Sequence, residues 1–300
     1  MEIIPNTLIV GFPKCGTTSV FQYLAAHPEV CATVEKETYY LMDPGHPLFN
    51  KSRNLYRNGT SGYKDFFPNP KPCEHIFLEA TPDYFYQNTA KEFIRGLTKK
   101  PKLLFIVRNP LDRIESLFRF ARYSVGLGLG AIDVNRYVDL LLDGKTNIFE
   151  QRPILRDAIE HSRYAKFIAP WVDIVGTENI LVKPIEDFKA DKLTVMESIS
   201  NYIGIDPLFY RSYSFELYNE TRFSRSIRLH YIVRRFVKVF PWIQKLRWIR
   251  LAYSSFNQRS SDVDRDRLDK GHRNALGEIL LPEWQELALR YRFEDTILGE

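Results

Sequence analysis

The sequence of 300 residues lacks most features of secreted, membrane-spanning and metal-binding proteins. Its only cysteines, Cys15, Cys31 and Cys73, have the spacing of neither a metal site nor a disulfide framework, which is typical of a reducing compartment. No apolar run reaches the roughly 18 residues of a membrane-spanning helix. A strand pattern begins almost at the first residue, which leaves no room for a signal peptide or membrane anchor. We therefore expect a cytoplasmic protein.

Repeats and low-complexity segments are also absent. Hydrophobic residues make up 44% of the chain and aromatic residues 14%, which suffices for a core and argues against disorder. The net charge of +5 suits an anionic nucleotide but does not by itself indicate a nucleic-acid partner. We expect one domain over residues 1–300, with a core at about 5–205 and a helical C-terminal or lid region at about 206–300.

Residues 11–19, Gly-Phe-Pro-Lys-Cys-Gly-Thr-Thr-Ser, form a glycine loop between the β-favouring run 7–10 and a helical stretch at 20–26. Such a loop exposes backbone N–H groups at a helix N-terminus, where anions bind. A Walker A loop has Gly-Lys-Ser/Thr, but here Thr17 follows the second glycine and the lysine lies earlier, at Lys14. The pattern predicts a phosphate site without the usual Mg²⁺ chemistry.

A second apolar strand, at 103–107, ends in Arg108-Asn109-Pro110 and leads into a helix that carries Ser116. Arg108 can grip a phosphate with its planar fork and Ser116 can donate a hydroxyl hydrogen bond. The alternative for Arg108 alone is an ion pair with an acid. The alternation of strands and helices predicts an α/β fold, with a P-loop-like, mostly parallel sheet and helices on both faces.

The remaining elements are less distinctive. We expect helices at 89–99, 111–123, 133–142, 163–171 and from about 282, and a short strand at 180–182. Tyr164 and Trp171 are expected to pack in the core. Residues 43–73 predict a long surface excursion, whose aromatic side chains either frame an acceptor pocket or pin the segment to the core.

The glycine loop and the Arg-Asn-Pro strand end together resemble the sulfotransferases that use 3′-phosphoadenosine 5′-phosphosulfate (PAPS), which include carbohydrate, heparan-type and bacterial soluble enzymes. Pro-Lys-x-Gly-Thr-Thr is similar to the 5′-phosphosulfate loop of this family, and Arg108 with Ser116 is similar to its 3′-phosphate site. The resemblance implies that the donor is bound by Lys14, Cys15, Gly16, Thr17, Thr18, Ser19, Arg108 and Ser116. A later stretch, similar to the loop that closes over the 3′-phosphate, adds Arg222 and Arg225.

The resemblance also implies a general base within residues 35–40, Glu-Lys-Glu-Thr-Tyr-Tyr. An alcohol is a poor nucleophile until its proton is accepted, and Glu37 matches the glutamate proposed as base in the carbohydrate members. Glu35 is expected on the same face of a strand, and the alternative for both is a solvated charged turn. Tyr39 and Tyr40 are expected to shield Glu37 and raise its pKa towards the working pH.

Glu79 ends another apolar strand, in the run Glu-Ala-Thr-Pro-Asp-Tyr, which is a further family resemblance. Some heparan enzymes carry a lysine after this glutamate, and Ala80 in its place makes a heparan-type acceptor doubtful. Glu79 is a second candidate base, or else it positions the acceptor or Lys14. Tyr39 is a further candidate for acceptor contact. His27, at a helix end before a proline, favours capping or packing over catalysis.

The implied reaction moves the sulfonate of PAPS to a hydroxyl of a small-molecule or carbohydrate acceptor and leaves adenosine 3′,5′-bisphosphate (PAP), without a metal. Glu37 accepts the proton, and Lys14 stabilises charge on the leaving phosphate. One alternative is a P-loop kinase, which would need a Mg²⁺ ligand that is missing in register. The other is a non-catalytic nucleotide-binding module, supported only by the basic stretch 219–250. The sequence indicates no oligomeric state.

Overall fold

The structure is a computed structural model that describes residues 3–67, 69–125, 132–216, 223–224, 258–259 and 266–292. Its contacts divide the chain into two compact units. The first unit comprises Met1–Asn109, Arg163–Tyr218 and Pro282–Glu300, and the second comprises Pro110–Ser162 and Asn219–Leu281. Each unit is described by itself below, and the expectation of one domain over the whole chain stays a prediction.

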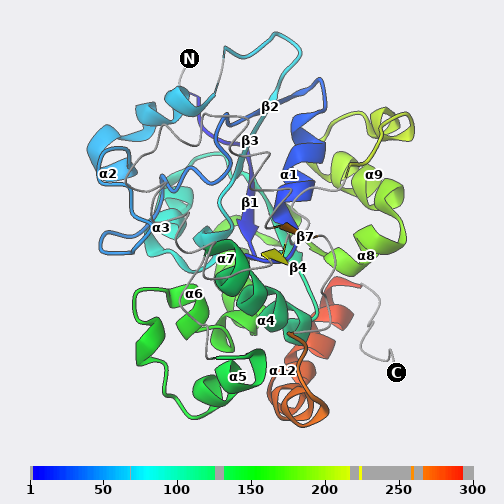
Figure 1. Cartoon of the computed structure of the whole chain (residues 1–300). Coiled ribbons are helices and arrows are strands. Elements are labelled where there is room, and N and C mark those ends of the chain that lie inside the picture. The colour runs from blue at the N-terminus through cyan, green and yellow to red at the C-terminus, as the bar shows by residue number, and fades with distance from the viewer. Residues whose placement is uncertain are drawn as a thin grey trace. The chain divides into compact units, whose positions relative to one another are not determined.

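The first unit is built on a five-stranded sheet in the order β2-β3-β1-β4-β5, with every neighbouring pair parallel (Figure 1). The strands are β1 Thr7–Gly11, β2 Val30–Ala32, β3 Ile76–Ala80, β4 Lys102–Val107 and β5 Ile180–Pro184. β1 lies between β3 and β4 and all its residues are buried, as expected for a central parallel strand. Because the strands are parallel, the C-terminal residues of β1, β3 and β4, which are Gly11, Ala80 and Val107, lie at the same edge of the sheet.

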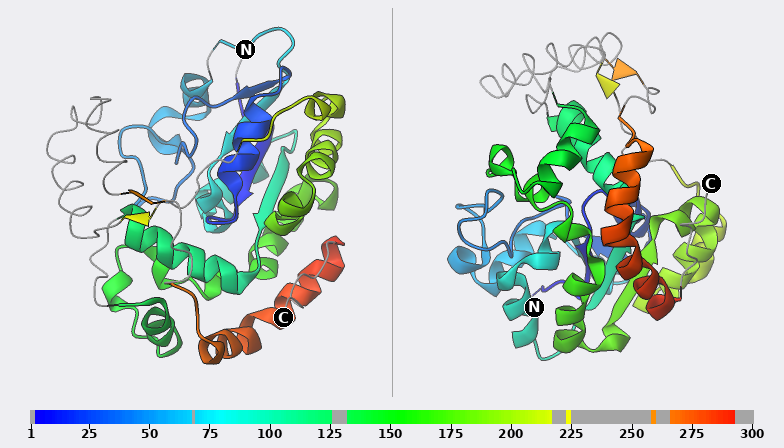
Figure 2. Two further views of the ribbon diagram at one scale, coloured as in Figure 1. Left: turned by 45° about the vertical axis from the view of Figure 1, so that its right-hand side comes forward. Right: turned by 90° about the horizontal axis from the view of Figure 1, so that it is seen from below.

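Helices cover this sheet on both sides (Figures 1 and 2). They are α1 Thr17–Ala25, α2 Leu55–Asn58, α3 Asn88–Gly96, α7 Tyr164–Val175, α8 Ile185–Ala190 and α9 Lys192–Ile203. The connection β1-α1-β2 runs across the sheet in one direction and β3-α3-β4 in the other. Right-handed crossovers therefore place α1 and α3 on opposite faces, and α7 packs beside α3. The predicted α/β fold with a parallel sheet is confirmed.

The excursion between β2 and β3 is held to the core of the first unit by aromatic side chains. Tyr63 and Phe66 are fully buried, and their rings lie 4.6 and 5.4 Å from that of Tyr40. Tyr56, in contrast, is exposed. Of the two alternatives for these aromatic residues, pinning to the core is the one observed for Tyr63 and Phe66.

The second unit is helical in most of the part that the structure describes. Its elements are α4 Pro110–Arg119, α5 Val134–Leu142, α6 Pro153–Arg156 and the antiparallel pair β6 Phe223–Ser224 and β7 Gln258–Arg259. The last helix, α12 Lys270–Tyr291, begins in this unit, and its part from Pro282 onward belongs to the first unit. It was expected to begin at about residue 282, which is wrong. It begins twelve residues earlier because Asp269 caps it, accepting from the His272 N–H at 2.9 Å.

Candidate active site

The loop between β1 and α1 has a backbone shape that only glycine tolerates at one point. Gly16 has φ +84°, and a Cβ there would lie 2.4 Å from Cδ1 of Ile185. Lys14 also has a positive φ, of 71°. The N–H groups of Gly16, Thr17 and Thr18 donate to no acceptor among the described residues. Three free N–H groups at the start of a helix have the geometry that binds anions.

Cys15 supports this loop from the inside. Its side chain is fully buried, and its Sγ lies 3.8 Å from the hydroxyl of Tyr164. Its N–H donates to the carbonyl of Phe12 at 3.2 Å. The role of Cys15 in binding the PAPS donor stays a prediction from the sequence. Tyr164 is buried as expected and donates to the carbonyl of Arg108 at 2.7 Å, which joins the loop to the end of β4.

Arg108, at the end of β4, does not form the ion pair that was the alternative to phosphate binding. No acid among the described residues lies within ion-pair distance of it, and its buried Nε has no hydrogen-bond partner. The charge of Arg108 acts on the Glu186 carboxyl group and favours its ionised form. Glu186 also accepts a hydrogen bond from the Asn109 N–H at 3.3 Å. Burial nevertheless raises the pKa of Glu186, which weakens its ability to neutralise the guanidinium.

Three other residues that were predicted to bind the PAPS donor lie elsewhere in the chain. Ser116 is buried on α4, in the second unit. Arg222 and Arg225 lie outside the described residues. Their roles in donor binding stay predictions from the sequence.

Glu37 lies in a tight turn rather than in a strand, because β2 already ends at Ala32. Glu37 and Tyr39 have φ of 67° and 54°, a conformation that side chains other than glycine rarely adopt. Oε1 of Glu37 accepts from Nζ of Lys36 at 2.7 Å, and Oε2 accepts from the Tyr39 hydroxyl at 2.5 Å. Both carboxylate oxygens are therefore fixed.

The charge state of Glu37 follows from opposing influences. Burial is the largest and opposes ionisation, but the charge and hydrogen bond of Lys36 and the hydrogen bond of Tyr39 outweigh it. The Lys14 charge acts in the same direction, so the pKa of Glu37 lies below its usual value. The expectation of a raised pKa is wrong, because Tyr39 donates a hydrogen bond to the ionised form. Glu37 is therefore a carboxylate at neutral pH, within the electrostatic reach of Lys14.

Glu35 does not share this environment. Its side chain is 55% exposed and forms an ion pair with Arg53. The expectation that Glu35 and Glu37 lie on one strand face is wrong, because the turn separates them. Glu35 matches the solvated charged residue that was the alternative interpretation of this stretch.

Glu79 is completely buried at the end of β3. Its roles as a second base or in acceptor contact stay predictions from the sequence. Its Oε1 accepts from the hydroxyls of Thr38, of Thr81 at 3.2 Å and of Tyr84 at 2.7 Å. Burial raises the pKa of Glu79, and these hydroxyl donors oppose the rise. Glu79 is thus an internal hydrogen-bond acceptor in this structure.

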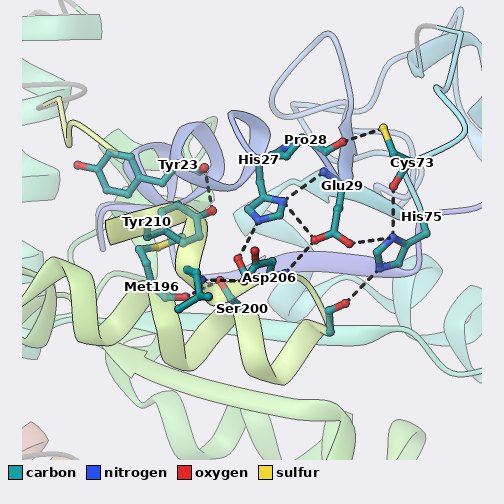
Figure 3. Close-up of polar contacts among 12 residues, drawn as sticks. Tyr23, His27, Pro28, Glu29, Cys73, His75, Met196, Ser200, Asp206 and Tyr210 are labelled. Atoms are coloured by element: carbon teal, nitrogen blue, oxygen red, sulfur yellow. Dashed lines mark hydrogen bonds and ion pairs between the residues drawn. The ribbon is translucent and has the colours of Figure 1, made fainter. Parts of the chain in front are cut away.

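His27 belongs to a separate polar cluster beyond the C-terminal end of α1, away from the loop at the start of that helix (Figure 3). Its Nδ1 accepts from the Glu29 N–H at 3.2 Å, and its Nε2 lies 3.0 Å from the Asp206 carbonyl oxygen. Glu29 in turn accepts from the Asp206 N–H at 2.8 Å. With both ring nitrogens engaged and the side chain buried, His27 has a packing role, which is one of the two expected.

The comparison with known families identifies the family of this chain. The chain matches the family model described as the sulfotransferase domain over residues 5–213. It belongs to the sulfotransferase family. The resemblance inferred from the glycine loop and the Arg-Asn-Pro strand end is confirmed. No helix in the described ranges is long and apolar enough to cross a membrane. The cytoplasmic location stays a prediction.

The names of two relatives of this sulfotransferase differ in the atom that receives the sulfonate, nitrogen in one and oxygen in the other. The bifunctional heparan sulfate N-deacetylase/N-sulfotransferase 4 of Mus musculus is 26% identical over 206 residues, which are 68% of this chain and 23% of that protein. The heparan sulfate glucosamine 3-O-sulfotransferase 3B1 of Mus musculus is 24% identical over 265 residues, 85% of this chain and 62% of that protein. The sulfotransferase from Alicyclobacillus acidocaldarius shares the fold, with a TM-score of 0.66 at 18% identity over 97% of each chain.

Two residues of the site were not foreseen from the sequence. Lys36 was treated as part of a solvated turn, although its side chain is only 13% exposed and pairs with Glu37. Thr38 is buried, and its hydroxyl donates a hydrogen bond to Glu79. The one available signal was the apolar and aromatic run after Thr38, which predicts burial at this point. Among the residues described, no group of three or more His, Cys, Asp or Glu is arranged to hold a metal. A metal-free reaction stays a prediction.

Proposed function

We propose that this sulfotransferase transfers the sulfonate of PAPS to a hydroxyl of a carbohydrate or small-molecule acceptor. The observation that carries the proposal is electrostatic. The charge of Lys14, in the loop at the start of α1, reaches the half-buried carboxylate of Glu37. A cation for the leaving phosphate and a base for the incoming hydroxyl therefore lie in one neighbourhood, as direct in-line transfer requires.

Two phosphate contacts are proposed for the donor within the first unit. The N–H groups of Gly16, Thr17 and Thr18, with the Lys14 ammonium, hold the 5′-phosphosulfate. Arg108, which has no ion-pair partner in the described part of the chain, holds the 3′-phosphate through its planar fork.

The transfer step needs no covalent enzyme intermediate. The acceptor oxygen attacks the sulfur and forms the new S–O bond, while the S–O bond to the 5′-phosphate breaks. Glu37 accepts the proton of the acceptor hydroxyl, and the electron pair of the broken bond leaves on PAP. Lys14 and the loop N–H groups stabilise the charge that grows on this phosphate.

Transfer to oxygen is proposed because an alcohol needs an ionised base in the transition state, and Glu37 is ionised at neutral pH. The two mouse relatives carry N-sulfotransferase and O-sulfotransferase in their names, so an amine acceptor must be tested beside the alcohols.

The test uses PAPS labelled in its sulfonate group and a panel of acceptors, each with and without EDTA. The panel holds heparan sulfate, its N-deacetylated form, p-nitrophenol and a long-chain alcohol. We expect label on a hydroxyl-bearing acceptor and release of PAP, unchanged by EDTA. Transfer only to the N-deacetylated polymer would replace oxygen by nitrogen as the target. Tight PAP binding without any transfer would support a non-catalytic module, and loss of transfer with EDTA would contradict a metal-free step.

A further inference from the structure

Glu79 gathers hydroxyl groups from two separate segments of the first unit around one fully buried carboxyl group. Thr38 comes from the turn after β2, while Thr81 and Tyr84 follow β3 itself. No cation among the described residues pairs with Glu79. Burying a carboxyl group that only hydroxyl groups stabilise costs free energy of folding. Such a group is retained where its hydrogen bonds hold the surrounding segments in place.

The turn that receives this support is the one that carries Glu37. Thr38 lies between Glu37 and Tyr39, which both have a left-handed backbone conformation. Such conformations persist where neighbouring groups hold them. The Glu37 N–H donates to the Ala80 carbonyl at 2.9 Å, and the Tyr40 N–H lies 3.3 Å from the Thr38 hydroxyl. The strained turn therefore rests on the end of β3.

We propose that Thr38 and Glu79 are positioning residues for Glu37. The hydrogen bond between them anchors the middle of the turn and thereby sets the direction of the Glu37 carboxylate and of the Tyr39 hydroxyl that binds it. This inference rests on the proposed role of Glu37 as the base. It adds that the second glutamate, at the end of β3, acts on the reaction only through the first.

A purely stabilising role predicts something different. A buried hydroxyl that only stabilises the fold changes the melting temperature, whereas a positioning hydroxyl changes turnover and the protonation of Glu37 without changing donor binding. The Thr38 hydroxyl is hydrogen-bonded to Glu79 and Tyr40, which lie outside residues 11–19, so affinity for PAP is a suitable internal reference.

Thr38→Val removes the hydroxyl and keeps the branched shape, and Thr38→Ser restores a hydroxyl. Thr33→Val is the matched control, because the Thr33 hydroxyl is buried on the same segment without a hydrogen-bond partner in the described structure. We expect Thr38→Val to lower kcat by about 10–100-fold, the cost of a small misplacement. Thr38→Ser should recover most of this loss, and Thr33→Val should match the wild type.

The measurements are kcat with labelled PAPS and the best acceptor of the panel, PAP affinity, melting temperature, and a ¹³C NMR titration of the Glu37 carboxyl group, assigned with Glu37→Gln. In Thr38→Val the pKa of Glu37 should rise with PAP affinity unchanged. The pair Thr38→Ala and Thr38→Ser carries the same comparison if Thr38→Val does not fold. Wild-type kcat and titration in Thr38→Val, with Glu37→Gln inactive, would overturn this inference alone. Full activity of Glu37→Gln would overturn the base and this inference together.

Discussion

The Tyr39 hydroxyl donates a 2.5 Å hydrogen bond to Oε2 of Glu37. In the proposed reaction the hydroxyl of the acceptor alcohol approaches this same carboxylate. A carboxylate oxygen can accept more than one hydrogen bond, so in the proposed reaction an acceptor shares Oε2 with Tyr39 or displaces it. Tyr39 influences both the pKa of Glu37 and the direction of its carboxylate.

The first prediction concerns the pH dependence of turnover. Lys36 and Tyr39 both favour the ionised form of Glu37, so Lys36→Met and Tyr39→Phe should each raise its pKa. A base must be deprotonated to act, so activity falls as pH falls through this pKa. The acidic limb of the kcat profile should therefore move to higher pH, further in Lys36→Met because Lys36 contributes both a charge and a hydrogen bond.

The control for this prediction is Tyr40→Phe. The Tyr40 hydroxyl donates to the Gly59 carbonyl at 2.6 Å and does not contact Glu37. Its removal should leave the acidic limb in place. Profiles of Lys36→Met and Tyr39→Phe that overlay the wild type would show that another group sets the limb.

The second prediction concerns the donor. Arg108→Ala should weaken PAP binding by about 1.5–3 kcal/mol, the range for a charge-assisted hydrogen bond. Binding of adenosine 5′-phosphate should hardly change, because it lacks the 3′-phosphate. Calorimetric titration of both nucleotides measures the difference. Arg211→Ala, at an exposed arginine paired with Glu197, is the control. An equal loss of affinity for both nucleotides would show that Arg108 does not bind the 3′-phosphate.

The third prediction separates binding from catalysis at Lys14. Lys14→Ala should lower kcat by about 10²–10³-fold, the usual effect of losing one preorganised group that stabilises developing charge. PAP affinity should fall much less, since the loop N–H groups remain. Lys71→Ala, at an exposed lysine, should change neither quantity. If PAP affinity falls by the same factor as kcat, Lys14 is a binding residue without a catalytic role.

The fourth prediction concerns the shape of the glycine loop. Gly16→Ala combines a left-handed backbone with a 2.4 Å approach of its Cβ to Ile185, so it should lower the free energy of unfolding by more than the roughly 1–3 kcal/mol of backbone strain alone. Gly204→Ala is the matched control, with φ +85° and open space around the new Cβ. Urea titrations compare the two. Equal losses would mean that Ile185 moves aside without cost.

Much of the fold could be predicted because its signals are local. The apolar run before Gly11 and the apolar run before Arg108 are both buried strands, and Gly16 marks the tight turn of the loop. The start of α12 was missed, although Asp269 is a good N-cap, because Pro282 was taken as a boundary and instead lies inside the helix.

The environment of the candidate base was less predictable, because it depends on contacts between distant segments. Nothing local indicates that Glu37 takes a left-handed conformation or that Thr38 is hydrogen-bonded to Glu79, a residue 41 positions away in the sequence. Charge alternation in Glu-Lys-Glu is typical of solvated turns, and only Glu35 fits that pattern. Lys36 is partly buried because its ammonium finds a partner in Glu37.

The base assignment is tested most directly by a single turnover of sulfonate-labelled PAPS, with enzyme in excess, in wild type, Glu37→Gln and Glu35→Gln. Glu37→Gln keeps the size of the side chain and removes the proton acceptor. We expect its transfer rate to fall by about 10²–10⁴-fold with PAP affinity near wild type, while Glu35→Gln transfers normally. A transfer rate in Glu37→Gln close to that of the wild type would contradict Glu37 as the base.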